Sequence, residues 1–166
     1  MLRVMECIRI RRATGTDAEG LTALVQESQA YRGQYAPVID GYEVTAAYVE
    51  RHQVFAAVDT AGRLVGFYSL ILDPAELDLA FVSDEAQGTG VGKLLMKHML
   101  DHARSAGLAD VRVVSNPPAE RFYLRMGAER VGVVAPTPPK VTWERPELRF
   151  VVGRRRVPGS EVTVIR

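Results

Sequence analysis

The spacing of apolar and polar residues changes its period in the middle of the chain, between residues 76 and 106. Over residues 76–82 the two kinds alternate, which predicts a strand buried on one side. One face would carry Leu77, Leu79 and Phe81, and the other Glu76, Asp78, Ala80 and Val82. From residue 91 to residue 106 apolar residues recur every three or four positions, which predicts an amphipathic helix. Its buried side would carry Leu95, Met96, Met99, Leu100, Ala103 and Ala106.

Further strand and helix signals occur on either side of this stretch, including two runs rich in β-forming residues at 54–58 and 64–72. We expect further strands at residues 6–11, 54–58, 64–72, 110–115, 130–135 and 148–152, and helices at residues 18–28, 44–52 and 119–126. Residues 30–42 are expected to form a loop, and the proline-rich residues 136–146 a connection between the last two strands. This order of elements predicts an α/β domain with a mixed sheet.

Composition narrows the class of protein. A chain of 166 residues suits one domain, and a net charge of +1 gives no overall field that would attract nucleic acid or an anionic membrane. No apolar run approaches the length of a membrane span, and the first residues lack the apolar core of a signal peptide. Cys7 is the only cysteine, so we expect a reducing, cytoplasmic setting.

The turn between the central strand and helix contains Gly88, Gly90 and Gly92. Glycines leave room for a ligand near the backbone, and the first amides of a helix attract phosphate. A P-loop is excluded, because Gln87 stands where its first glycine would be and Leu94 where its hydroxyl would be. A dinucleotide fingerprint is excluded because the third glycine comes one residue early and the motif lies mid-chain.

Residues 87–92, Gln-Gly-Thr-Gly-Val-Gly, resemble the Arg/Gln-x-x-Gly-x-Gly/Ala pyrophosphate loop of the GNAT superfamily of N-acetyltransferases. A second segment, Asn116 followed by residues 119–128, is similar to the Asn…Ala-x-x-Phe-Tyr-x-x-x-Gly-Phe segment of that family. It departs from the family at Ala128, where an aromatic residue is common. The resemblance covers roughly residues 9–152.

The resemblance implies a fold and a cofactor. The expected fold is a GNAT domain over residues 1–152, an α/β (α+β mixed) fold with about four helices and a mostly antiparallel sheet splayed between its fourth and fifth strands. Residues 153–166 would form a basic C-terminal tail, with an extra strand as an alternative for part of it. The co-substrate would be acetyl-CoA, with no metal. By the resemblance it would be held by the backbone of Phe81, Val82 and Ser83, by the loop residues Gln87, Gly88, Thr89, Gly90, Val91, Gly92 and Lys93, and by Asn116.

Proton transfer is assigned partly by resemblance. Tyr123 matches the residue that often protonates the leaving CoA thiolate, and a phenol remains protonated at neutral pH. The alternative is that Tyr123 and its neighbour Phe122 only pack a short helix. The amine must lose a proton, and Glu76 or Asp78 could accept it, with Glu76 preferred because it resembles a carboxylate on this strand in some relatives. The alternative is that both face solvent and water is the base.

The acceptor would enter between the loop after the first helix and the connection between the last strands. Tyr31, Tyr35, Asp78 and Trp143 are therefore candidate substrate contacts. The alternative is that these aromatics only pack and cap the fold. His98 and His102 have a spacing that can bind a metal, but no third ligand is evident and the flank of a helix is the preferred interpretation.

Taken together, the residues predict an acetyl-CoA-dependent N-acetyltransferase that acts on a primary amine of a small molecule or peptide by direct transfer. The alternative is a non-catalytic acyl-CoA-binding sensor. A nucleic-acid role for Arg154, Arg155 and Arg156 is disfavoured, because three arginines in a tail are usually only solvated. The chain is expected to be a monomer or a homodimer, the latter if residues 161–165 form a strand at a sheet edge.

Overall fold

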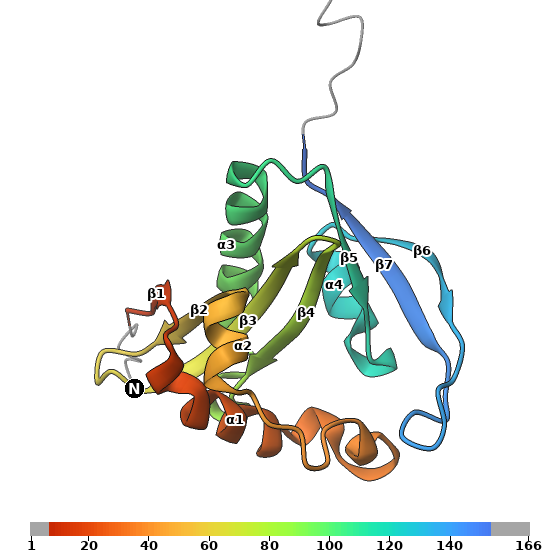
Figure 1. Cartoon of the computed structure of the whole chain (residues 1–166), viewed down its shortest axis with the longest axis horizontal. Helices are drawn as coiled ribbons and strands as arrows, with labels where there is room; N and C mark the ends of the chain where they lie inside the picture. The colour runs from red at the N-terminus through yellow and green to blue at the C-terminus, as the bar shows by residue number, and fades with distance from the viewer. Residues whose placement is uncertain (1–6, 154–166) are drawn as a thin grey trace, which may run out of the picture.

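The alternating segments form one seven-stranded sheet in the order β1-β2-β3-β4-β5-β7-β6 (Figure 1). The structure is a computed structural model that describes residues 7–153. The strands are β1 Arg9–Arg12, β2 Gln53–Val58, β3 Leu64–Leu72, β4 Ala75–Val82, β5 Asp110–Val114, β6 Glu129–Val134 and β7 Arg145–Val151. Neighbouring strands are antiparallel except β4 and β5, which are parallel. The predicted mixed, mostly antiparallel sheet is confirmed. Of the predicted tail, residues 154–166 lie outside the described residues.

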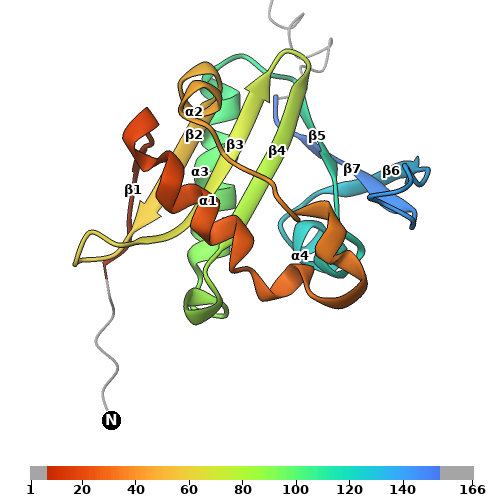
Figure 2. The same cartoon turned by 60° about the horizontal axis from the view of Figure 1, so that its bottom comes forward.

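Four α-helices cover the two faces of the sheet: α1 Ala18–Gln26, α2 Ala46–Arg51, α3 Val91–Ser105 and α4 Glu120–Arg125. Figure 2 shows α1 crossing in front of the strands and α3 behind them. Short 3₁₀ turns complete the chain: η1 Gly15–Asp17, η2 Gln29–Tyr31, η3 Gly33–Val38, η4 Asp84–Ala86 and η5 Pro117–Ala119. The expected loop at residues 30–42 therefore contains two 3₁₀ turns, η3 and the end of η2.

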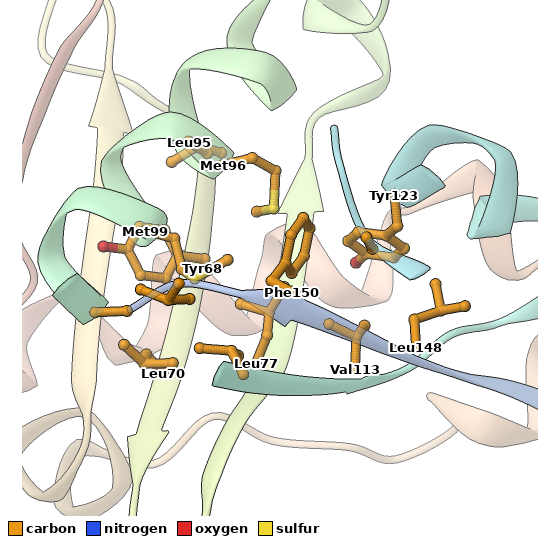
Figure 3. Close-up of a cluster of buried hydrophobic side chains, with 14 of the residues drawn as sticks. Tyr68, Leu70, Leu77, Leu95, Met96, Met99, Val113, Tyr123, Leu148 and Phe150 are labelled. Atoms are coloured by element: carbon orange, nitrogen blue, oxygen red, sulfur yellow. The ribbon is translucent and has the colours of Figure 1, made fainter. Parts of the chain in front are cut away.

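Each face of the sheet has its own apolar core. On one face, α3 and α4 pack on the strands through a cluster that includes Met96, Met99, Tyr123 and Phe150 (Figure 3). On the other face, Leu21 and other residues of the α1 side pack on the sheet. The apolar stripe of α3 is largely as predicted, but Ala106 is exposed because the helix ends at Ser105.

The sheet opens between its fourth and fifth strands. The only residues of β4 and β5 that pair with each other are Glu76, near the amino end of β4, and Arg112, in the middle of β5. β5 pairs along its whole length with β7 on its other side. The two halves of the sheet therefore meet near Glu76 and diverge toward the carboxyl ends of β4 and β5, which confirms the predicted splay.

A bulge in β4 changes which way its side chains face. Leu70 of β3 pairs with Leu77, and the next β3 residue, Ser69, pairs with Leu79, so Asp78 is an extra residue on β4. Leu77 consequently packs in the α3 core, whereas Phe81 packs in the α1 core. The expectation that Leu77 shares a face with Leu79 and Phe81 is wrong, since a bulge resets the alternation.

The last strand begins earlier than expected, at Arg145 rather than at residue 148. Pro146 lies inside the strand, where its carbonyl oxygen accepts a hydrogen bond of 3.0 Å from the N–H of Ser115. Leu148 and Phe150 face the α3 core. Because side chains alternate along a strand, Arg145 must face the opposite side, toward α1.

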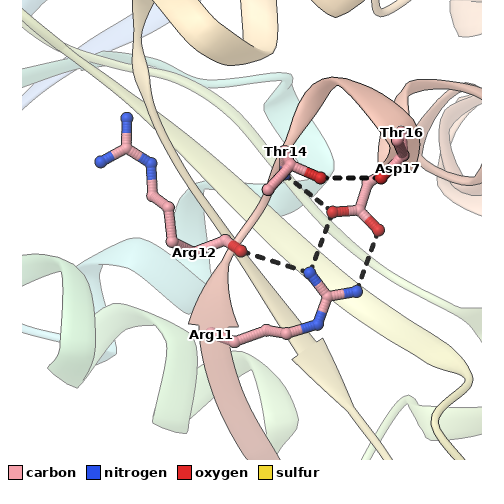
Figure 4. Close-up of polar contacts among 5 residues, drawn as sticks. All are labelled: Arg11, Arg12, Thr14, Thr16 and Asp17. Atoms are coloured by element: carbon pink, nitrogen blue, oxygen red, sulfur yellow. Dashed lines mark hydrogen bonds and ion pairs between the residues drawn. The ribbon is translucent and has the colours of Figure 1, made fainter.

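The entry into α1 is fixed by a charge-assisted contact (Figure 4). Arg11 donates two hydrogen bonds of 2.9 Å to the two carboxylate oxygens of Asp17, and the N–H of Thr14 donates a third of 2.8 Å. These donors, with Arg11 first, lower the pKa of Asp17 from its ordinary value of 3.8, against the effect of burial. The contact ties β1 to the first turn before α1.

We expect Asp17→Asn to lower the free energy of unfolding by about 1 to 2 kcal/mol at neutral pH, because a bidentate ion pair with a carboxylate that is 13% exposed is lost. The folded pKa lies below the unfolded one, so this contribution is present above the unfolded value and is lost as pH falls through the folded value. Urea unfolding at several pH values measures both effects.

The matched control is Asp101→Asn on α3. Asp101 also forms ion pairs, with Lys97 at 3.3 Å and Arg104 at 3.0 Å, but it is 57% exposed. We expect no resolvable loss of stability from this variant, because water screens such pairs. Equal losses in the two variants would contradict the assignment of Asp17 as a structural anchor.

Candidate functional site

A cavity of about 660 Å³ opens where β4 and β5 diverge. Its wall brings together residues that are far apart in the sequence, from the η2 turn, β4, the glycine-rich loop, the end of β5 and α4. Of the residues predicted from sequence, it is lined by Tyr31, Asp78, Phe81, Val82, Gln87, Gly88, Gly90, Gly92, Lys93, Asn116 and Tyr123. The predicted residues Glu76, Ser83, Thr89, Val91, Tyr35 and Trp143 lie outside this lining.

The glycine-rich loop has a backbone that side chains would disfavour. Gly88 and Gly90 have φ angles of 76° and 95°, in the left-handed region. The first bond inside α3 runs from the N–H of Leu94 to the carbonyl of Gly90, at 3.0 Å. The N–H groups of residues 91–93 therefore have no partner within the helix, and they provide the positive end of its dipole. This corner is suited to a phosphate group.

Close packing explains the third glycine. A Cβ atom on Gly92 would lie 3.2 Å from Cζ of Phe122, on α4. Gly92 thus lets the start of α3 approach α4 closely, which keeps the loop next to Tyr123.

Two other residues of the loop region make hydrogen bonds that fix the backbone there. Gln87 donates from Nε2 to the carbonyl oxygen of Val82, at 3.0 Å, and so ties the loop to the end of β4. The N–H of Ser83 donates to the carbonyl of Val65, at 2.9 Å. Of the three residues expected to offer backbone to a cofactor arm, Phe81 and Val82 therefore line the cavity, while the N–H of Ser83 is engaged by the sheet.

We expect Gly90→Val to weaken CoA binding about tenfold, because a β-branched residue at a φ of 95° costs about 1 to 2 kcal/mol and would displace the loop. Isothermal calorimetry with CoA measures the effect. Gly107→Val is the control: Gly107 also has a positive φ, 81°, and open space around it, but it lies outside the cavity lining. An equal loss of CoA affinity in both variants would contradict a specific role for the loop.

Tyr123 projects from α4 into the core beside the cavity (Figure 3). It is 9% exposed, and its ring packs against Phe150 at a centroid distance of 6.4 Å and against Phe122 at 5.4 Å. Burial raises the pKa of the Tyr123 hydroxyl, so this phenol stays protonated over the whole range around neutrality. It can therefore act as a hydrogen-bond donor inside the cavity.

Two polar side chains in the cavity wall have buried atoms that lack a partner among residues 7–153. These atoms are Oδ1 of Asn116, a residue that is 8% exposed, and Nε of Arg145. The N–H of Ser115 donates to the carbonyl of Pro146. Asn116, which follows β5, therefore lies near Arg145, the first residue of β7. Buried polar atoms are normally paired, so both are available to a bound molecule.

The two candidate carboxylates have different surroundings. Glu76 sits at the closed end of the splay, 3.6 Å from Arg112, and burial raises its pKa while Arg112 opposes that rise. Asp78, the bulge residue, is exposed and lines the cavity. Tyr48 donates a hydrogen bond from Oη to Asp78, and its hydroxyl also contacts Oγ of Ser69 at 2.6 Å. The bulge thus aims Asp78 at the α1 side of the cavity and Tyr48 holds it there.

The predicted acceptor aromatics divide into two groups. Tyr31 lines the cavity and packs on Phe81 with a centroid distance of 5.5 Å. Tyr35 and Trp143 instead contact each other edge to face at 5.0 Å, outside the lining. This contact, with a 3.1 Å hydrogen bond from Lys140 to the carbonyl of Asp40, joins the η2–η3 segment to the connection before β7. The aromatic pair therefore joins these two segments outside the cavity wall.

Sequence reasoning missed three residues of the site: Arg145, Tyr42 and Tyr48. Arg145 falls in the expected proline-rich connection at residues 136–146, although the alternation of Arg145, Glu147 and Arg149 with Pro146, Leu148 and Phe150 marks a strand that starts at residue 145. Tyr42 lines the cavity and Tyr48 orients Asp78. No short motif marks these two tyrosines, because the bulge that brings Asp78 to them is a property of the folded sheet.

His98 and His102 lie on the flank of α3, as the preferred interpretation had it. Nδ1 of His98 is 2.8 Å from Oη of Tyr68, and Nε2 of His102 is 3.0 Å from Oε1 of Gln53. Within residues 7–153, no three His, Cys, Asp or Glu side chains are grouped in a way that would bind a metal ion. In the same part of the chain, no helix has the length and apolar character needed to cross a membrane.

Comparison with known proteins matches residues 25–134 to the model of the family described as "Acetyltransferase (GNAT) domain". A mycothiol acetyltransferase of Actinosynnema mirum is 40% identical over 80 residues, which are 45% of this chain and 27% of that protein. The peptidyl-lysine N-acetyltransferase YjaB of Salmonella typhimurium is 28% identical over 134 residues, 75% of this chain and 86% of that protein. The match thus spans about a quarter of the first relative and most of the second.

Solved structures share the fold. The ribosomal-protein-S18-alanine N-acetyltransferase of Escherichia coli superposes with a TM-score of 0.68 at 19% identity, over 90% of this chain and 97% of that one. The PaiA N-acetyltransferase of Thermoplasma acidophilum, solved in complex with coenzyme A, has a TM-score of 0.69 at 19% identity, over 87% of this chain and 99% of that one. Both likenesses concern the arrangement of the chain in space.

Proposed function

The chain belongs to the GNAT family of acetyltransferases, and from this premise we propose that it transfers the acetyl group of acetyl-CoA to a primary amine. One observation carries the proposal: a single cavity brings the glycine-rich loop, the unpaired side of β4, Tyr123 and Asp78 into reach of one another. A phosphate-binding corner at one end and proton-handling groups at the other suit a cofactor that carries an acyl group on a long arm.

In the proposed binding mode, the N–H groups of residues 91–93 hold the pyrophosphate of acetyl-CoA. The pantetheine arm lies between β4 and β5, where it pairs with the backbone of Phe81 and Val82. The unpartnered Oδ1 of Asn116 accepts a hydrogen bond from the arm. Lys93 lines the cavity beside the loop and adds positive charge near the phosphates.

The proposed reaction is a direct transfer. The neutral amine nitrogen attacks the thioester carbonyl carbon, a C–N bond forms and the C–S bond breaks, and the amine loses one proton while the sulfur gains negative charge. Tyr123 donates a hydrogen bond to that sulfur. Because burial raises the pKa of Tyr123, its main contribution is to stabilise the developing thiolate charge as a donor.

We propose Asp78, rather than Glu76, as the carboxylate that receives the acceptor's proton, directly or through one water. Asp78 lines the cavity and is oriented by Tyr48, whereas Glu76 lies outside the lining and faces Arg112. This reverses the order of preference given by the sequence. Glu76 instead joins the two halves of the sheet.

The acceptor class is proposed from the relatives and the site together. The names of the relatives refer to mycothiol and to peptidyl-lysine, so amines of small molecules and of peptides are both included. Acetyl-CoA and the single free cysteine, Cys7, suit a reducing cytoplasmic setting. The monomer-or-dimer prediction stays a prediction.

The test is release of CoA thiol from acetyl-CoA, read with a thiol reagent, across a panel of amino acids, polyamines, aminoglycosides and short peptides. Acceptor-dependent release, with the acetylated amine identified by mass spectrometry, is the expected result. Binding of acetyl-CoA in calorimetry without release for any acceptor would overturn the proposal and favour an acyl-CoA sensor.

A further inference from the structure

Arg145 is a charged group of the cavity that the proposed chemistry leaves without a task. It is half-buried at the first residue of β7 and lines the cavity. Its Nε atom is buried and has no hydrogen-bond partner among residues 7–153, and within that range its guanidinium forms no ion pair. Such a group is costly to desolvate unless a ligand pairs with it.

The position of Arg145 separates it from the cofactor loop. Leu148 and Phe150 face the α3 core, so the alternation of β7 directs Arg145 to the α1 face of the sheet. The glycine-rich loop lies at the start of α3, on the opposite face. The charge of Arg145 is felt by Tyr31: burial raises the pKa of this tyrosine, and Arg145 partly offsets the rise. Arg145 therefore belongs to the acceptor side of the cavity.

The acceptor side carries one charge of each sign. Asp78 lies on β4 and Arg145 on β7, on the two halves of the splayed sheet, and the two do not form an ion pair with each other. Glu76, the other acidic group nearby, is engaged by Arg112 at 3.6 Å, and Arg112 also holds Glu147 at 2.7 Å. The charge of Arg145 also opposes the rise of the pKa of Glu76, but Arg145 forms no ion pair with it, so its guanidinium remains free for a ligand of the cavity.

We propose that Arg145 binds an oxyanion carried by the amine acceptor itself, so that the substrate is a small amine that also bears an acidic group, as an amino acid does. The inference rests on the proposed acetyl transfer and specifies its substrate. A guanidinium presents two parallel N–H donors that match the two oxygens of a carboxylate. The acceptor's amine then points toward Asp78 and its acidic group toward Arg145, which fixes its orientation.

The experiment compares acceptors that differ only in this charge. Each amino acid of the panel is assayed beside its carboxamide, and an aminoalkylphosphonate of similar size distinguishes a carboxylate from other oxyanions. We expect the wild-type protein to prefer the acid over the amide by about 10- to 100-fold in kcat/KM, and Arg145→Gln to reduce that ratio to near one. Arg145→Lys should restore part of the preference.

Arg149→Gln is the matched control, because Arg149 lies on the same strand and the same face but outside the cavity lining, 3.7 Å from Glu129. It should leave the acid-to-amide ratio unchanged. A ratio near one in the wild-type protein, or equal losses for acid and amide in Arg145→Gln, would overturn the proposal. A selective loss of CoA affinity in Arg145→Gln would also overturn it, since it would assign Arg145 to the cofactor.

Calorimetry keeps this inference separate from the proposed function. The same acid and amide are titrated into protein saturated with CoA, so the readout needs no turnover. A preference for the acid that disappears in Arg145→Gln supports the oxyanion site even if no acetyl transfer is seen. Absence of that preference contradicts the site even if transfer to other amines is fast.

Discussion

Replacing Tyr123 with phenylalanine is expected to lower kcat for acetyl transfer by about 100- to 1,000-fold, while the dissociation constant for acetyl-CoA changes by no more than about twofold. The loss follows from the position of Tyr123, which is 9% exposed, lines the cavity and keeps its proton because burial raises its pKa. Phenylalanine keeps the contacts with Phe150 and Phe122, so the core should stay intact. Thiol-release kinetics and calorimetry measure the two effects.

The control for Tyr123→Phe is Tyr68→Phe. Tyr68 is also buried and its hydroxyl has a partner, His98, but it lies outside the cavity lining. Removing that hydroxyl should cost some stability and leave kcat unchanged. The pH profile of Tyr123→Phe near neutrality should keep the wild-type shape, because a protonated phenol does not titrate there. Equal losses of kcat in both variants would show that Tyr123 acts only through packing.

Local pattern was enough to predict most of the fold. The continuous apolar run at residues 64–72 forms the strand β3, which is buried on both faces, and the amphipathic helix α3 forms where expected, because burial decides both patterns. Two features escaped prediction. The bulge at Asp78 arises from register with β3, which no local pattern marks. The early start of β7 has a signal in the alternation from Arg145 onward, but Pro146 and the prolines before it favour a connection.

In the site, too, residues marked by a local sequence pattern were predicted and residues brought in by distant elements were not. The glycine loop was predictable because glycine, helix start and strand end are adjacent in sequence, and Tyr123 and Asn116 came with a second local segment. Arg145, Tyr42 and Tyr48 reach the cavity only through the packing of distant elements. The acceptor side is assembled from such elements, which explains why the sequence predicts the cofactor better than the acceptor.

The geometry of the two carboxylates leads to opposite expectations for their amides. We expect Asp78→Asn to lower kcat/KM for the amine about 100-fold, because an amide cannot take the proton that the attacking nitrogen loses. Glu76→Gln should leave kcat within a few-fold of wild type and mainly weaken the contact with Arg112, which joins β4 to β5. Each substitution removes one charge and keeps the shape of the side chain, so each serves as the control for the other.

Two further measurements distinguish a role of Asp78 as the base from a role in binding the amine only. If Asp78 receives the proton, the rate of Asp78→Asn should recover at higher pH, where the free amine is more abundant and less assistance is needed. If Asp78 only binds the ammonium form, KM should rise while kcat stays near wild type. A large loss of kcat in Glu76→Gln, with Asp78→Asn nearly unaffected, would return the role to the residue that the sequence alone favoured.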